Sequence, residues 1–300
     1  LVGDHPGDTV EANIQILVRD TYTGKNLWTY VSANGNDGIT TIRTRKDGAN
    51  GAQSVSYSAA ETGSKEDTVN TDAMATGELW NYSVNPAGAT GTITVSMLST
   101  LLQHSGTGTF MLAATDGAFQ AEDVIRYHAF TGEKGNTTTE ARAQFTLRTD
   151  GTLRNLRVYV SANSIDANTV ARTRVNAGNG AQVATITAST TGSFEDTTNV
   201  DTVTGANADE WNYLVDSTST KMGNVTIRTA QVEYSCIGRP HIWSTASALY
   251  SLDQYLPLEG SEQSTTEANS QLKARVALTI AKLFAYVSAN TATVCDVYFR

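Results

Sequence analysis

Two acidic segments carry the residue types that could bind a metal ion. Residues 66–72 read E-D-T-V-N-T-D and residues 195–201 read E-D-T-T-N-V-D. Carboxylate and amide oxygens at close spacing suit calcium, which takes six to eight oxygen ligands. The other interpretation is a turn in which Asp and Asn bind their own backbone. The candidate ligands are Glu66, Asp67, Asn70, Asp72, Glu195, Asp196, Asn199 and Asp201.

Two aromatic pairs have the spacing of a ring-stacking platform for sugars. Trp80-Asn81-Tyr82 recurs as Trp211-Asn212-Tyr213. Aromatic residues two positions apart share one face of a strand, and that face either binds a carbohydrate or packs into the core. Because Trp buries a large apolar surface, we expect both pairs in the core.

The residues needed for catalysis are not grouped in any recognisable way. The four histidines do not recur at equivalent positions, and no segment resembles a nucleophile with its base. A catalytic site is normally single, whereas every distinctive phrase of this chain is duplicated. Cys236 and Cys295 belong to no Cys/His cluster, so no zinc site is indicated. They either pair or remain free thiols. We therefore expect a protein that is not an enzyme and has no cofactor other than, in one interpretation, calcium.

Short phrases recur along the chain at a nearly fixed distance, and they define the elements that must position these residues. Glu-Ala-x-x-Gln begins at 11, 140 and 267, and Tyr-Val-Ser-Ala-Asn at 30, 159 and 286, so both spacings are 129 and then 127 residues. A period of this size fits one small domain per repeat. We divide the chain into a lead-in (1–10), repeat 1 (11–103), a first connecting segment (104–139), repeat 2 (140–235), a second connecting segment (236–266) and a partial repeat 3 (267–300).

Hydrophobic residues alternate along the repeats with the period of a β-strand. Turn clusters rich in Gly and Asn separate the alternating segments, for example at residues 34–38, 47–51 and 176–180. This pattern predicts an all-β fold of tandem antiparallel β-sandwich, jelly-roll-like repeats of about 128 residues. Each connecting segment is expected to add one edge strand, with residues 126–130 and 254–258 at matching places. The expected core residues are Leu27, Val31, Trp80, Tyr82, Leu156, Val158, Val160, Trp211 and Tyr213.

The order of phrases resembles tandem all-β modules of viral and phage structural proteins, and also those of environmental surface-filament proteins. The pattern is Y-V-S-A-N, then R-x-x-G-x-N-G-A-Q, then T-G-x-x-E-D-T-x-N-x-D, then W-N-Y, with small departures between the copies. The resemblance implies a role in assembly, decoration or adhesion, and a location outside the cell or on a virion surface. It implies no catalytic residues.

Composition narrows the classes of partner. The net charge of −9 and the pI near 4.9 give a surface that repels phosphate backbones, so nucleic-acid binding is not expected. No apolar run approaches the roughly 20 residues that a membrane-spanning helix needs. Few residues are charged, and the chain is rich in Thr, Gly and Asn, which suits a β-rich exported or particle-bound protein.

The partial repeat 3 supplies only the opening strands of a sandwich. Three strands without a second sheet leave an apolar face and an open edge, and both favour association. Either the natural chain continues past Arg300, or another copy covers this face. We therefore expect a non-enzymatic structural protein that assembles head to tail into a filament, tube, fibre or shell; the alternative is an adhesin or carbohydrate-binding module. The expected assembly residues are Leu278, Ile280, Leu283, Ala285, Val287, Val294 and Phe299.

Overall fold

The computed structural model describes residues 8–104, 109–121, 124–129, 137–147, 149–218 and 222–236, with isolated positions after residue 264. In this part of the chain the elements are β-strands and three short 3₁₀ helices, and all strand pairs are antiparallel. The all-β antiparallel fold expected from the alternation is therefore confirmed. No helix among the described residues is long and apolar enough to cross a membrane.

Repeat 1 consists of two antiparallel sheets. Its first sheet has the order β1-β6-β3-β4, and its second sheet the order β5-β2-β7. A 3₁₀ helix, η1 (Glu11–Asn13), precedes the first strand. The strands are β1 (Ile16–Leu17), β2 (Tyr22–Asn34), β3 (Thr40–Lys46), β4 (Ala49–Tyr57), β5 (Gly63–Met74), β6 (Leu79–Asn85) and β7 (Ile93–His104).

Repeat 2 pairs its strands in the same order. Its first sheet contains β10-β15-β12-β13, and its second contains β14-β11-β16. Ile16 pairs with Trp80 in repeat 1, as Phe145 pairs with Trp211 in repeat 2. Two short helices, η2 (Glu140–Arg142) and η3 (Gly205–Asn207), accompany the strands. The strands are β10 (Phe145–Thr146), β11 (Gly151–Asn163), β12 (Thr169–Val175), β13 (Gly178–Ile186), β14 (Gly192–Val203), β15 (Glu210–Asp216) and β16 (Asn224–Cys236).

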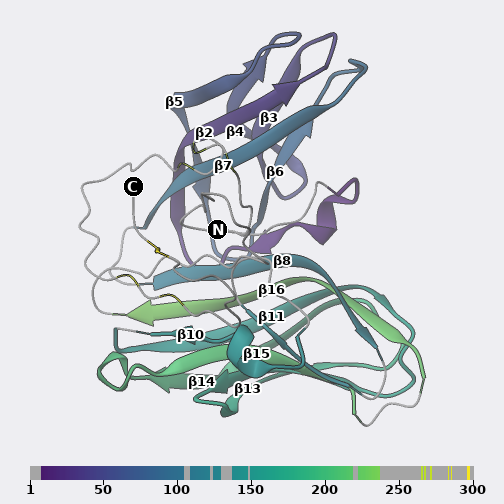
Figure 1. Ribbon diagram of the computed structural model, residues 1–300, viewed down its shortest axis with the longest axis vertical. Coiled ribbons are helices and arrows are strands. Elements are labelled where there is room, and N and C mark those ends of the chain that lie inside the picture. Colours follow the sequence, from purple (N-terminus) through teal and green to yellow (C-terminus); the bar gives the residue numbers. More distant parts are fainter. Residues whose placement is uncertain are drawn as a thin grey trace.

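The first connecting segment contributes two strands to repeat 2, where the sequence predicts one. The strand β8 (Thr109–Ala121) pairs along β16 and adds a fourth strand to the second sheet. The strand β9 (Ile125–His128) pairs with Tyr213–Asp216 of β15. In Figure 1, β8 and β16 lie on the side of repeat 2 that faces repeat 1. Both sheets of repeat 2 are therefore extended by the segment that links it to repeat 1.

The two repeats differ in how continuous their cores are. In repeat 2, one cluster joins Leu156, Val158 and Val160 of β11 to Trp211 and Tyr213 of β15, so side chains of both sheets meet. In repeat 1 the buried apolar side chains form two separate clusters. The first cluster is Ile16, Val18, Tyr22, Met74 and Trp80, and the second is Val31, Ile42, Val55 and Tyr57.

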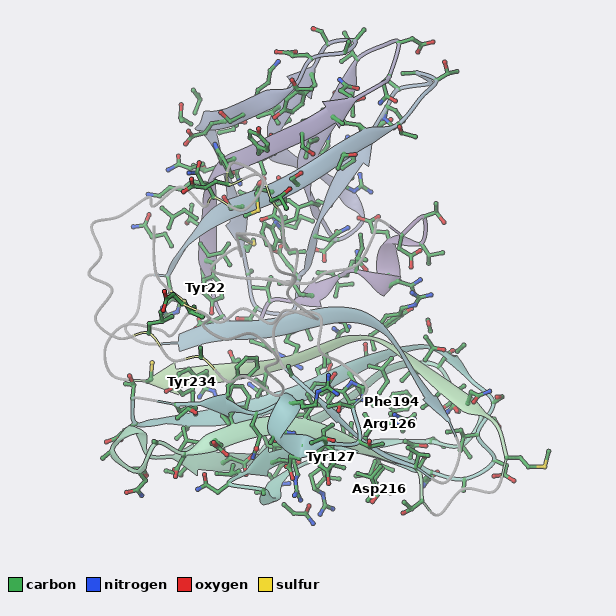
Figure 2. All side chains as sticks on the ribbon, viewed as in Figure 1. Tyr22, Arg126, Tyr127, Phe194, Asp216 and Tyr234 are labelled. Atoms are coloured by element: carbon green, nitrogen blue, oxygen red, sulfur yellow. The ribbon has the colours of Figure 1, made fainter. Side chains whose placement is uncertain are left out.

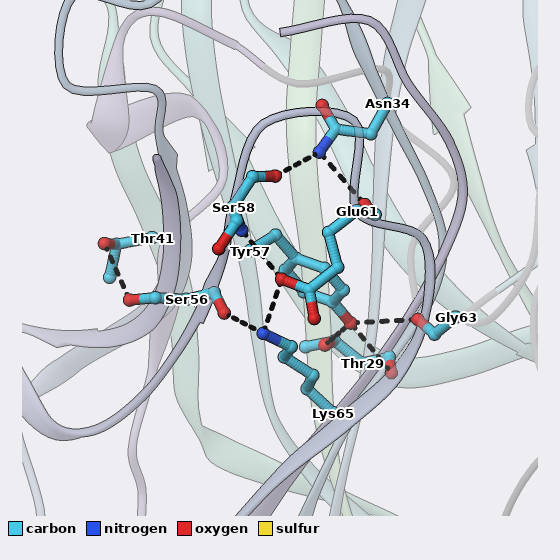
Figure 3. Close-up of polar contacts among 9 residues, drawn as sticks. All are labelled: Thr29, Asn34, Thr41, Ser56, Tyr57, Ser58, Glu61, Gly63 and Lys65. Carbon is cyan, nitrogen blue, oxygen red and sulfur yellow. Dashed lines mark hydrogen bonds and ion pairs between the residues drawn. The ribbon is translucent and has the colours of Figure 1, made fainter. Parts of the chain in front are cut away.

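Polar residues inside repeat 1 explain part of this difference. The buried Thr29 hydroxyl lies 2.7 Å from the Tyr57 hydroxyl, and the Lys65 ammonium lies 5.0 Å from the centre of the Tyr57 ring (Figure 3). Lys65 also pairs with Glu61 at 2.8 Å. At the equivalent positions repeat 2 has apolar residues, namely Val158, Ile186 and Phe194. Repeat 2 thus has apolar side chains at the positions of Thr29, Tyr57 and Lys65.

Candidate functional site

The acidic segments of repeat 1 form hydrogen-bond centres between strands. Asp72 accepts hydrogen bonds from the Thr44 hydroxyl, the Ala52 amide and the Gln53 side chain. Asp67 accepts hydrogen bonds from three backbone amides and from the side chain of Asn70. Both carboxylates are about 7% exposed, so these donors replace the water that each lost on folding.

Repeat 2 repeats this arrangement atom for atom. Asp201 binds the Thr173 hydroxyl, the Ala181 amide and the Gln182 side chain. Burial of the Asp196 carboxyl works to raise its pKa, but hydrogen bonds from Asn199 and from backbone amides outweigh this and lower the pKa to about 2. The fold therefore stabilises the negative form of the Asp196 carboxyl.

These contacts leave the acidic segments poorly suited to calcium. Among the described residues, no group of three or more His, Cys, Asp or Glu side chains is placed to hold a metal. Glu195 contacts Arg19 at 2.6 Å and Arg157 at 3.5 Å. The carboxylate oxygens of the four aspartates accept hydrogen bonds from backbone amides and side chains of the protein. The geometry favours the backbone-binding interpretation of these segments over the calcium interpretation.

The aromatic pairs also lie away from solvent. Trp80 and Trp211 are 1% and 0% exposed, and Tyr213 is 2% exposed. Tyr82 is half-buried and its ring meets that of Trp80 edge-on at 4.9 Å. Neither tryptophan offers a face on which a sugar ring could stack. The other expected core residues, Leu27, Val31, Leu156, Val158 and Val160, are all 0% exposed.

A joint between the repeats is the first arrangement that sequence reasoning missed. The side-chain carbonyl of Gln231 accepts a hydrogen bond from the Leu17 amide, and its NH₂ group donates to the Leu17 carbonyl. Thr229 donates to the Asn13 carbonyl beside it. The beginning of repeat 1 therefore lies on the outer face of the second sheet of repeat 2, with its backbone polar groups satisfied there.

Charged residues border this joint. Arg19 of repeat 1 lies 2.6 Å from Glu195 of repeat 2, and the Arg228 guanidinium lies 3.7 Å from the Asp8 carboxylate. Arg157 is 4% exposed and contacts Glu195 and the Ser193 hydroxyl. Nothing in the sequence pattern distinguishes these residues from ordinary surface charges, because their partners lie far away along the chain.

The second arrangement that sequence reasoning missed is the packing of β9 against the edge of β15 in repeat 2. The ring of His128 stacks on that of Tyr213, with the ring centres 4.9 Å apart. His128 is 1% exposed, and burial, with a smaller effect of the Arg126 charge, lowers the pKa of its imidazole from 6.5 to about 3. The imidazole is therefore neutral at pH 7 and packs in the interior as an uncharged planar ring. Figure 2 shows Arg126 and Tyr127 of β9 beside the end of β15 at Asp216.

The guanidinium of Arg174 also contacts β9, and other residues hold it in place. Arg174 forms a two-pronged ion pair with Glu140, at 2.8 and 2.9 Å, and donates to Asn179. Its guanidinium lies 5.8 Å from the centre of the Tyr127 ring, within reach of a cation–π contact. The strand β9 is thus bound by its backbone, by one stacked ring and by one ring against a cation.

The expected assembly residues fall almost entirely outside the described residues. Of the seven, Leu283 and Ala285 are described, and both are exposed, Leu283 at 47%. Cys236 is a buried free thiol, and Cys295 lies outside the described residues. His104 contacts Asp20 at 2.8 Å. In the described part of the chain these groups form no nucleophile–base arrangement.

No protein-family model matches this chain, and no curated protein matches it.

Proposed function

We propose that this protein is a non-enzymatic structural protein whose tandem β-sandwich repeats assemble head to tail into an extended filament or fibre, outside the cell or on a virion. The observation that carries the proposal is the pairing of β8 and β9 with the two sheets of repeat 2. The first connecting segment extends both sheets of repeat 2, so backbone hydrogen bonds hold the link from repeat 1 firmly on repeat 2. Such a connection suits a load-bearing array better than a flexible string of binding modules.

The joint between the repeats supports the same function. It brings the beginning of repeat 1 against the second sheet of repeat 2, so two different surfaces meet. This contact fixes the two repeats of one chain against each other, as a stiff array requires. The first residues of each repeat are held by the same ion pair within that repeat. Glu140 pairs with Arg174 in repeat 2, as Glu11 pairs with Arg45 in repeat 1.

The alternative is an adhesin or carbohydrate-binding module, in which repetition raises avidity. The buried tryptophans remove the sugar platform that the sequence suggested for it. The expected polymer contact involves the C-terminal region of one copy, namely the second connecting segment and the partial repeat 3, and the first repeat of the next copy.

Negative-stain electron microscopy of the purified protein separates these functions. We expect filaments or regular particles at micromolar concentration, and their loss in a variant that lacks residues 267–300. Dispersed single molecules at every concentration, combined with binding in a glycan screen, would replace this proposal by the adhesin function.

A further inference from the structure

A threonine, a glutamine and an aspartate form a buried polar triad inside each repeat. In repeat 1 the triad is Thr44 of β3, Gln53 of β4 and Asp72 of β5. Strands β3 and β4 are paired neighbours in one sheet, and β5 belongs to the other sheet (Figure 1). Thr44 and Gln53 are 0% exposed, and Asp72 is 7% exposed. The triad therefore joins the two sheets at a place that is almost closed to water.

One carboxylate oxygen contacts both of the other members of this triad. Oδ2 of Asp72 accepts a hydrogen bond from the Thr44 hydroxyl at 2.5 Å and another from the Gln53 side-chain nitrogen at 2.9 Å. The Thr44 hydroxyl oxygen also lies 3.4 Å from the backbone carbonyl oxygen of Gln53. A carboxylate that accepts the proton of a hydroxyl has the position of a general base, and here the same oxygen also contacts the nitrogen of an amide.

The side-chain carbonyl of Gln53 is bound as well. The Leu27 amide donates a hydrogen bond to Oε1 of Gln53 at 2.9 Å, and this contact is buried. A backbone N–H at this oxygen stabilises negative charge that develops on it, as in an oxyanion hole. A nucleophile, a base and an oxyanion donor therefore surround one amide group.

Repeat 2 builds the same triad from Thr173, Gln182 and Asp201. The Thr173 hydroxyl and the Gln182 side-chain nitrogen both donate to Oδ2 of Asp201, the nitrogen at 2.9 Å. The Leu156 amide donates to Oε1 of Gln182 at 3.0 Å. All three members of the triad are buried. The arrangement is thus a property of the repeat and not of one position in the chain.

A glycine keeps space around each hydroxyl. A Cβ atom on Gly51 would clash with the Thr44 hydroxyl, and one on Gly180 would clash with the Thr173 hydroxyl. Neither glycine adopts the left-handed backbone conformation. The space that the hydroxyl needs, and not the shape of the backbone, therefore explains why both positions are glycine.

We propose that each triad forms an ester bond between the threonine hydroxyl and the glutamine side chain. In repeat 1 the Asp72 carboxylate takes the proton of the Thr44 hydroxyl while Oγ1 attacks Cδ of Gln53. Asp72 then gives this proton to the departing side-chain nitrogen. The Oγ1–Cδ bond forms, the Cδ–Nε2 bond breaks, and one ammonia leaves. The step needs no oxidant, cofactor or second substrate.

The surroundings of the triad favour this reaction and preserve its product. The fold holds the two reacting groups on one oxygen before the reaction, which removes much of the entropic cost of bringing them together. Burial keeps out the water that would hydrolyse the ester. After the reaction, Asp72 keeps the hydrogen bond from the Ala52 amide at 2.6 Å. An ester that ties β3 to β4 suits a load-bearing fibre, but the inference does not depend on head-to-tail assembly.

Mass spectrometry of the full chain tests the ester directly. We expect the wild-type mass to lie below the mass of the sequence by two ammonia molecules, one for each repeat. A tryptic digest should contain the dipeptide Thr44-Arg45 joined to the peptide of residues 47–65. Thr44→Val should remove one of the two losses, and Thr44→Ser, which keeps a hydroxyl, should retain both. Asp72→Asn keeps the hydroxyl and the amide but removes the base, so repeat 1 should stay unlinked.

The Asn-Gly pairs at 34–35, 50–51 and 179–180 require a control, because asparagine before glycine also loses ammonia when it forms a succinimide. A succinimide joins no peptides and survives Thr44→Val. Hydroxylamine added to the unfolded protein should separate the joined peptides, because it cleaves esters. A circular dichroism spectrum equal to that of the wild type shows that each variant folds, and the joined peptide of the unchanged repeat 2 is the internal reference.

The outcomes separate this inference from the proposed function. Joined peptides that disappear in folded Thr44→Val and persist in Thr44→Ser support the ester. A wild-type mass equal to that of the sequence, after a day in neutral buffer, overturns it. An ammonia loss without joined peptides, unchanged in Thr44→Val/Thr173→Val, overturns it as well. Filaments without the ester leave the structural function standing, and the ester without filaments leaves this inference standing.

Discussion

The side chain of Gln231 binds both backbone polar groups of Leu17, which lies 214 residues earlier in the chain. An amide side chain that satisfies a backbone N–H and C=O acts as one rung of a β-ladder. The joint between the repeats therefore includes a direct contact between one side chain of β16 and the backbone of β1. The equivalent strand of repeat 1 has Ser99 at this place, so this rung belongs to the joint between repeats 1 and 2.

Replacing Gln231 by alanine should loosen the joint without unfolding either repeat. Two hydrogen bonds to a partly buried backbone are lost, at a cost of about 1–3 kcal/mol to the contact. We expect a larger maximum dimension in small-angle X-ray scattering and an unchanged circular dichroism spectrum. Gln103→Ala, at an exposed position of β7, is the control and should change neither quantity. An unchanged scattering curve for Gln231→Ala would show that other contacts hold the repeats together.

Replacing a central aspartate by asparagine should destabilise its own repeat. In Asp201→Asn the new amide NH₂ group would face donors that now bind a carboxylate, which costs about 1–3 kcal/mol. Asp72→Asn should act equally on repeat 1, because its contacts are the same. Differential scanning calorimetry measures the loss of stability in both variants. If addition of calcium or a chelator shifted the wild-type transition by several degrees, the hydrogen-bond account of these aspartates would be wrong.

Gly51, which lies beside the Asp72 carboxylate, should resist substitution because a side chain at this position has no room. A Cβ atom on Gly51 would lie 2.9 Å from the Asp72 carboxylate and also clash with the Thr44 hydroxyl. Gly51→Ala should therefore lower the melting temperature of repeat 1, whereas Ala52→Gly, one residue further along β4, should have a smaller effect. Equal effects of the two changes would remove the argument that this glycine makes room for the carboxylate.

The stability of repeat 2 should fall as the pH is lowered from 7 to 5. The pKa of His128 is about 3 in the folded protein and 6.5 in its ordinary state. Between these values the unfolded chain binds a proton that the folded chain does not, so stability rises with pH and is complete above about pH 6.5. The loss between pH 7 and pH 5 should be about 2 kcal/mol. Urea titrations at several pH values measure it, and His128→Leu should flatten the dependence.

The local part of this fold could be predicted from the sequence, and the long-range part could not. Alternation placed Leu156, Val158 and Val160 on one strand face, because the period of two is a property of neighbouring residues. The second strand of the first connecting segment and the Gln231 contact depend on pairing over long separations, which leaves no local signal. The aspartates were ambiguous because a carboxylate that binds calcium and one that binds backbone amides look alike until the donors are placed. Asp72 and Asp201 take the second role.

Sedimentation velocity of the full chain over a wide concentration range tests the central claim most directly. A head-to-tail polymer of a 32.0 kDa chain should give an open series of species, whose average size keeps growing with concentration. Deleting residues 237–300, which leaves β16 complete, should reduce the series to a single monomer with both sandwiches folded. A wild-type protein that stays monomeric, or stops at a closed dimer at every concentration, would contradict the account.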